Sequence, residues 1–153
     1  MLALTGCDDI GPPPPELMYE GLPVQGDWQT AQRAGFTKCI EYGRGLRCRA
    51  KAVMLKGRGP FQAAVDLLGK DARGGFRELT LWHDSDHRAA LSVGDLLETQ
   101  GWKLCRTGQE DRGDQEIYTK AGSPVRISID ISYFGKRRLR VLPERSQATG
   151  RCW

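Results

Sequence analysis

The stretch TKCIEYGRGLRCRAKAV, residues 37–53, carries the clearest folding signal in the chain. Two runs suited to β-strands flank Gly43 and Arg44, and a glycine at the first central position is typical of a two-residue type II′ turn. A hairpin built on that turn places Cys39 opposite Cys48 at a non-hydrogen-bonded position. The Cα atoms of such a pair approach to about 4.5 Å, which is compatible with a disulfide. The stretch therefore predicts a hairpin with a disulfide across it.

The other cysteines extend this argument. With Cys39 paired to Cys48, and with Cys7 set aside for a reason given below, Cys105 and Cys152 are left to form a second disulfide. Four thiolates around zinc are the alternative, but their spacing lacks the CxxC knuckles of structural zinc sites. An even number of cysteines in a small domain indicates an oxidising compartment such as the periplasm.

Three short helices are predicted around this hairpin. The first follows residue 27, with Asp27 as its cap and Gly35 at its end. The second runs over residues 60–68, because Pro60 suits the first helical position and Gly69 the position after the last turn. Its apolar stripe has helical spacing and consists of Phe61, Ala64, Val65 and Leu68. The third covers residues 92–100, with Ser92 and Asp95 resembling a capping box and Val93, Leu96 and Leu97 forming its buried face.

Strand patterns fill the rest of the chain, at residues 75–84, 102–106, 116–120, 125–134 and 137–142. The run VRISIDISYF alternates strictly between apolar and polar residues. A three-residue loop over residues 135–137 pairs Tyr133 with Leu139 and Ile131 with Val141, which keeps the apolar faces together. The opposite, solvated face then bears three arginines, namely Arg126, Arg138 and Arg140.

These patterns predict an α+β fold. Two or three short helices pack on one face of a mainly antiparallel sheet, and two disulfides staple the domain. With 39% hydrophobic residues, the chain can build one core.

The first residues resemble another class of signal. Leu4-Thr5-Gly6-Cys7 is similar to the lipobox of bacterial lipoproteins, in which a signal peptidase cuts before a cysteine that is then acylated. The resemblance implies that Cys7 is the lipidated residue, and that Asp8 behind it favours retention in the inner membrane. A secretory signal has a basic region and about 7–15 apolar residues. We therefore expect a basic and apolar extension encoded upstream of Met1.

The charge distribution suggests how the chain is divided. The first 30 residues contain no Lys or Arg and five acidic residues, so all 23 basic residues follow them. We assign residues 1–6 to a signal-peptide remnant, residues 7–26 to an acidic tether stiffened by four prolines, and residues 27–153 to a single domain.

The densest polar cluster is HDSDH, residues 83–87. On a helix, His83 and His87 would lie on one face and could bind zinc, with Asp84 or Asp86 as a third ligand or a base. Because the cluster lies between a strand and a helix, a solvated turn is the favoured interpretation.

No motif in the sequence identifies a reaction. The leading hypothesis is a lipid-anchored, periplasm-facing lipoprotein whose domain binds an envelope protein, peptidoglycan or anionic lipid without catalysis. Its binding residues would be the solvated arginines at positions 126, 138 and 140, because a basic surface attracts anionic partners. The alternatives are a metal-dependent hydrolase centred on the HDSDH cluster and a structural spacer or scaffold. We expect no cofactor and no nucleic-acid partner.

Overall fold

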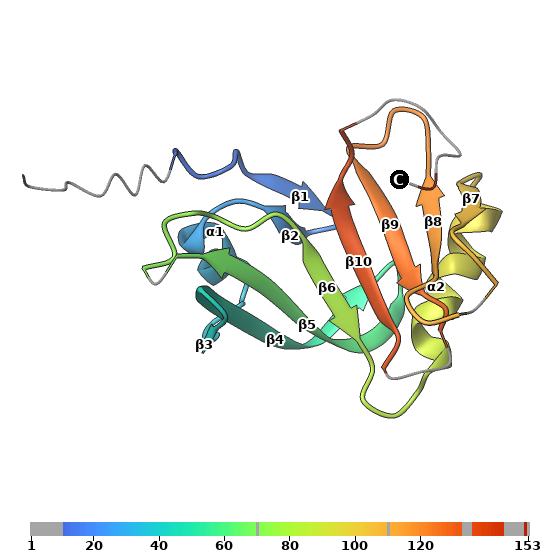
Figure 1. The fold of residues 1–153 in the computed structure, drawn as a ribbon, viewed down its shortest axis with the longest axis horizontal. Coiled ribbons are helices and arrows are strands. Elements are labelled where there is room, and N and C mark those ends of the chain that lie inside the picture. Colours follow the sequence, from blue (N-terminus) through green and yellow to red (C-terminus); the bar gives the residue numbers. More distant parts are fainter. Residues whose placement is uncertain (1–10, 70, 110, 133–135, 146–151, 153) are drawn as a thin grey trace, which may run out of the picture.

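The computed structural model describes residues 11–69, 71–109, 111–132, 136–145 and 152. Ten strands and two helices lie within these residues (Figure 1). The first half contains β1 (Leu17–Tyr19), β2 (Leu22–Gln25), α1 (Trp28–Arg33), β3 (Lys38–Tyr42), β4 (Gly45–Leu55), β5 (Arg58–Leu68) and β6 (Leu79–Trp82). The second half contains α2 (Arg88–Thr99), β7 (Lys103–Arg106), β8 (Gln115–Thr119), β9 (Val125–Asp130) and β10 (Arg138–Pro143).

Eight of these strands form one sheet, in which every neighbouring pair is antiparallel. The strand order is β3-β4-β5-β6-β10-β9-β8-β7, so the last strand of the sequence lies between β6 and β9. Strands β1 and β2 form a separate two-stranded sheet. The predicted α+β class is confirmed.

The hairpin that opened the sequence argument forms in the predicted register. Strands β3 and β4 pair Cys39 with Cys48 across the turn, and Gly43 takes a φ of 59° there. The Cys39–Cys48 disulfide joins Cα atoms 4.0 Å apart. The structure also contains the Cys105–Cys152 disulfide, with Cα atoms 5.5 Å apart.

Helix α1 begins at the predicted cap. The Asp27 carboxylate accepts a hydrogen bond from the backbone N–H of Thr30, and the Thr30 hydroxyl oxygen accepts one from the backbone N–H of Asp27. The hydrogen bond from the Thr30 N–H holds the pKa of the Asp27 carboxyl below its ordinary value. The structure agrees with the prediction here because the capping signal is local in sequence.

The predicted helix over residues 60–68 is wrong, because these residues belong to β5. Its apolar residues fit both a helical stripe and a strand with alternating faces. Pairing with β4 on one side and β6 on the other decides between the two patterns. Val65 is buried on the core side, whereas Leu68, assigned to the buried helical stripe, is half exposed.

The boundaries of α2 also differ from the prediction. The helix begins at Arg88 with His87 as its cap residue, four residues before the predicted start. Ser92 therefore lies inside the helix, where its hydroxyl donates to the Ala89 carbonyl oxygen. Val93 and Leu97 are fully buried, as expected from their spacing, but Leu96 is only partly buried.

The register between β9 and β10 differs from the predicted one by four residues, and the predicted three-residue loop is wrong. Leu139 pairs with Ile129 and Val141 with Ile127, so seven residues, 131–137, connect the two strands. The apolar faces still match, because a shift by an even number of residues preserves alternation. The predicted partner Tyr133 lies outside the described residues.

The acidic segment before the domain is only partly a tether. Residues 17–25 fold into the β1–β2 hairpin, and Val24 in β2 is completely buried in the core. Gly26 then forms a β-bridge with Phe76. The hydrophobic residues between the polar ones explain this docking, since burying one aliphatic side chain contributes about 1.5–3 kcal/mol. Cys7 and Asp8 lie outside the described residues.

The core lies between one face of the sheet and the two helices. Helix α2 contacts β5, β6, β8 and β9, and Ala31 of α1 is buried in the same cluster. Among the described residues, no helix is both long and apolar enough to cross a bilayer. The other face of the sheet carries the polar side chains considered next.

Candidate functional site

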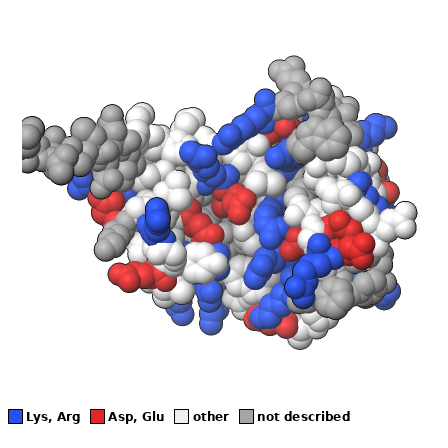
Figure 2. All heavy atoms as spheres, in the orientation of Figure 1, with Lys and Arg blue, Asp and Glu red and all other residues white. Residues whose placement is uncertain are grey.

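The solvated face of the sheet is hollowed into a basin of about 510 Å³. Residues of β4, β5, β6 and β10 line it, together with residues from the edge strand and from the connections that follow β6 and β9. Basic and acidic side chains are interspersed across the centre of the face seen in Figure 2. The basin is lined by Tyr42, Arg47, Arg49, Lys51, Gln62, Ala64, Asp66, Glu78, Thr80, Trp82, Asp84, Lys136, Arg138 and Arg140.

Strand alternation places these side chains together. The strand β4 reads Arg47, Arg49 and Lys51 at every second position, so the three basic side chains point to one face. Cross-strand pairing places Ala64 of β5 opposite Arg49. Ala64 pairs in turn with Thr80 of β6, and Thr80 pairs with Arg140 of β10, so these four residues form one row across the sheet. The small alanine side chain leaves the middle of this row open.

Three ion pairs fix part of the basin. The Arg47 Nε lies 2.6 Å from an Asp66 carboxylate oxygen, and a second guanidinium nitrogen lies 2.9 Å from the other oxygen. Arg140 Nη1 lies 2.7 Å from Asp130 Oδ1, with both side chains only about one fifth exposed. At the mouth of the basin, Lys136 Nζ lies 3.1 Å from Asp84 Oδ1. These paired groups shape the basin and neutralise one another.

Other basic side chains of the basin have no such partner. Arg49, Lys51 and Arg138 are exposed, and none of them forms an ion pair with another described residue. The lining as a whole has six basic and three acidic side chains. The basin therefore carries positive charge that the described part of the protein leaves uncompensated.

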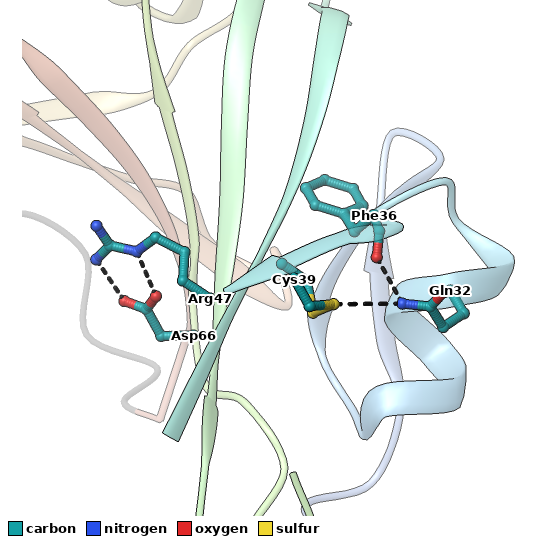
Figure 3. The surroundings of a disulfide bond; sticks show 6 residues. Gln32, Phe36, Cys39, Arg47 and Asp66 are labelled. Carbon is teal, nitrogen blue, oxygen red and sulfur yellow. Dashed lines mark hydrogen bonds and ion pairs between the residues drawn. A yellow bond between two sulfur atoms is a disulfide. The ribbon is translucent and has the colours of Figure 1, made fainter. Parts of the chain in front are cut away.

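Two arginine–aromatic contacts in the basin differ in kind. The Arg47 guanidinium carbon lies 3.6 Å from the centre of the Tyr42 ring, which is a closed stack. The Arg49 guanidinium carbon lies 5.7 Å from the centre of the Trp82 ring, near the outer limit of a cation–π contact. Figure 3 shows Arg47 held by Asp66 on the side of the hairpin opposite the Cys39 disulfide. Arg47 is therefore fixed by two partners, whereas Arg49 has one loose contact.

The opposite side of this hairpin is anchored separately. The Gln32 side-chain amide donates to the Phe36 carbonyl oxygen at 2.8 Å and contacts the Cys39 sulfur at 3.6 Å (Figure 3). Helix α1 is thereby tied to the disulfide that holds β3 against β4. The basin wall is thus supported from the core side.

The Asp84 carboxyl also affects the basin. Its pKa lies below the ordinary value chiefly because Lys136 donates a hydrogen bond to it, and the Trp82 and Gln62 side chains act in the same direction. The carboxylate is therefore held in its charged form, and it holds the Lys136 side chain close to the end of β6.

The HDSDH cluster is a turn in the structure. His83 Nδ1 accepts hydrogen bonds from the backbone N–H groups of Ser85 at 3.3 Å and Asp86 at 2.9 Å. The Asp86 carboxylate in turn accepts from the Arg88 N–H at 2.8 Å, next to the first turn of α2. In the described part of the chain, no three His, Cys, Asp or Glu side chains are grouped so as to hold a metal ion. His83 is thus used to form the connection between β6 and α2.

A pair of substitutions separates this role from a metal role. Replacing His83 with Ala is expected to lower the free energy of unfolding by about 1 kcal/mol, because two backbone donors lose their acceptor. Replacing His87 with Ala should change it by less than about 0.5 kcal/mol, since the side chain of His87 makes no capping hydrogen bond. Urea denaturation of both variants tests this. A shared metal ion would give a different result. Both variants would then lose the same free energy of unfolding, and the wild type treated with a chelator would be no more stable than either variant.

The predicted binding arginines are divided by the structure. Arg138 and Arg140 line the basin, whereas Arg126 does not line it. Arg126 of β9 pairs with Leu142 of β10. Leu142 is the next residue after Arg140 on the same face of β10, so Arg126 lies on the basin face but beyond the basin itself. Arg140 is already bound to Asp130, so only Arg138 of the three is an unpaired basin cation.

The basic side of β4 was not among the binding residues predicted from the sequence. Its signal was available, because Arg47, Arg49 and Lys51 alternate with the buried or smaller residues of one strand. Trp82 was missed because its position on the basin face depends on the pairing of β6 with β5 and β10. No protein-family model, curated protein or solved structure matches this chain.

Proposed function

We propose that this protein is a non-catalytic binding module of the bacterial cell envelope, and that its basin holds an anionic ligand. The observation that carries the proposal is the group of three basin cations, Arg49, Lys51 and Arg138, which have no ion-pair partner among the described residues. Such groups attract carboxylates and phosphates and form charge-assisted hydrogen bonds with them. A concave site on a rigid sheet also preserves the spacing of these groups before the ligand arrives.

The cellular location is part of the proposal. Two disulfides are typical of proteins that fold in an oxidising compartment. The lipobox resemblance at Cys7 suggests that acyl chains hold the protein to a membrane, on its periplasmic side. Asp8 favours the inner membrane weakly. Within that compartment, candidate anionic ligands are peptidoglycan, an acidic surface of an envelope protein, or anionic lipid.

The basin favours binding over the two alternatives. A hydrolase centred on His83 would have to use a ring whose Nδ1 already accepts two backbone hydrogen bonds in the turn, which leaves the proton of the neutral imidazole on Nε2. A pure spacer would have no use for a hollow with uncompensated charge.

Binding of a simple carboxylated polymer tests the proposal. We expect the full chain to bind poly-L-glutamate or oligogalacturonate in a salt-dependent manner by isothermal titration calorimetry. The double variant Arg49→Gln with Arg138→Gln should bind at least about tenfold more weakly, which corresponds to about 1.4 kcal/mol.

A matched control keeps the net charge change the same. The double variant Arg58→Gln with Arg88→Gln removes two exposed cations that do not line the basin, and it should retain wild-type affinity. Equal loss in both double variants would show attraction by overall charge and not by the basin. Absence of binding to every carboxylated polymer would contradict the proposed function itself.

A further inference from the structure

We infer that the anionic ligand of the basin is a carboxylate-bearing glycan, with one sugar ring packed on Trp82 and its carboxylates held by Arg49 and Arg138. This inference rests on the proposed function and names the chemical class of its ligand. It follows from what lies between the unpaired cations.

The floor of the basin is suited to hydroxyl groups. Between Arg49 on β4 and Arg138 on β10, the strands β5 and β6 present Gln62, Thr80 and Trp82. An amide and a hydroxyl can each donate and accept hydrogen bonds, as sugar hydroxyls do. A phosphate ion could accept hydrogen bonds from the amide and the hydroxyl, but it would leave the apolar face of Trp82 without a contact.

Trp82 lies in the centre of this arrangement. It pairs with Gln62 on one side and with Arg138 on the other, and its side chain is partly exposed in the basin. An indole ring offers a broad apolar surface to the C–H face of a pyranose ring. The Arg49 guanidinium carbon lies 5.7 Å from the centre of this ring and so does not close the stack as Arg47 does on Tyr42.

The spacing of the charges suits an extended chain. Arg49 and Arg138 are three strands apart, which is about 14 Å at about 4.8 Å per strand in a flat sheet. This is a separation of backbones, and the long side chains shorten it, since the Arg49 guanidinium already reaches to within 5.7 Å of the Trp82 ring. An extended ligand with several carboxylates can contact both arginines and the groups between them. The basin volume of about 510 Å³ is within the usual range for sites that bury a ligand of a few rings.

A comparison of four probes tests the inference with the full chain. Oligogalacturonate and soluble peptidoglycan fragments carry carboxylates on a glycan, poly-L-glutamate carries carboxylates without sugar, and dextran oligomers carry sugar without charge. We expect the better of the two acidic glycans to bind at least about tenfold more tightly than poly-L-glutamate, and dextran to bind more weakly than either glycan. The tighter of the two glycans then identifies the source, an acidic polysaccharide or the cell wall.

Variants at the platform separate the sugar contact from the charge contact. Trp82→Ala should reduce glycan affinity at least about tenfold and leave poly-L-glutamate affinity unchanged, and Trp82→Phe should recover part of the loss. Trp28→Ala removes a half-exposed tryptophan of α1 that does not line the basin, and it should bind like the wild type. Circular dichroism and thermal unfolding verify that each variant is folded.

The failures of the two proposals differ in this experiment. Equal affinity for poly-L-glutamate and both glycans, or glycan binding that Trp82→Ala leaves intact, overturns the inference and leaves an anion-binding basin. Loss of all carboxylate binding in the wild type overturns the proposed function as well.

Discussion

Replacing Cys105 and Cys152 together with alanine is expected to lower the free energy of unfolding by about 4 kcal/mol. The disulfide joins residues 47 apart in the sequence and ties β7, the last strand at one edge of the sheet, to the C-terminal segment. In the chain-entropy model a longer closed loop restricts the unfolded chain more, so its removal favours unfolding more. Urea denaturation under oxidising conditions measures the loss.

The second disulfide provides the comparison. Removing Cys39 and Cys48, which are nine residues apart, should lower the free energy of unfolding by about 2.5 kcal/mol by the same argument. Cys48 is fully buried, so a small packing loss adds to that value. A loss of less than about 1 kcal/mol for the Cys105 and Cys152 variant would contradict the prediction that this bond pins the C-terminal segment.

Gly45→Ala is expected to destabilise the protein by about 3 kcal/mol. Gly45 is buried in β4 directly after the turn, and a β-carbon built on it would overlap the backbone carbonyl oxygen of Leu67 in β5. That oxygen belongs to the residue that pairs with Leu46 of β4, so it cannot move without disturbing the ladder between β4 and β5. Thermal and urea unfolding measure the change.

The neighbouring turn residue is the control for this prediction. Arg44→Ala alters the same turn at an exposed position, and it should change the free energy of unfolding by less than about 0.5 kcal/mol. If Gly45→Ala and Arg44→Ala had the same free energy of unfolding, the close approach of Gly45 in β4 to Leu67 in β5 would be contradicted.

Local signals were enough to predict several elements of the fold. The turn at Gly43 sets the register of β3 and β4, and the disulfide follows from that register. The cap at Asp27 likewise defines the start of α1 within a few residues. In both cases the deciding interactions lie close together in the sequence.

Where the deciding interactions are distant, the sequence was ambiguous. The apolar residues of β5 satisfy a helical and a strand period, and only its two neighbouring strands distinguish them. The register of β9 and β10 has the same difficulty, since any shift of two residues keeps Leu139 on the apolar face.

The candidate site shows the same limit. Arg138 was identified from the alternation within its own strand. The contributions of Arg49 and Trp82 depend on four strands that come from separate parts of the chain. A basin made by cross-strand register is therefore visible only once the strand order is known.

The place of β10 between β6 and β9 also bears on how the molecule is assembled during synthesis. The strands β3 to β6 and the strands β7 to β9 are each made earlier in synthesis, but within the sheet only β10 joins the two groups. Neither group can acquire its final neighbour until residues 138–143 have left the ribosome. Until then, the edges of β6 and β9 that β10 occupies have no strand beside them.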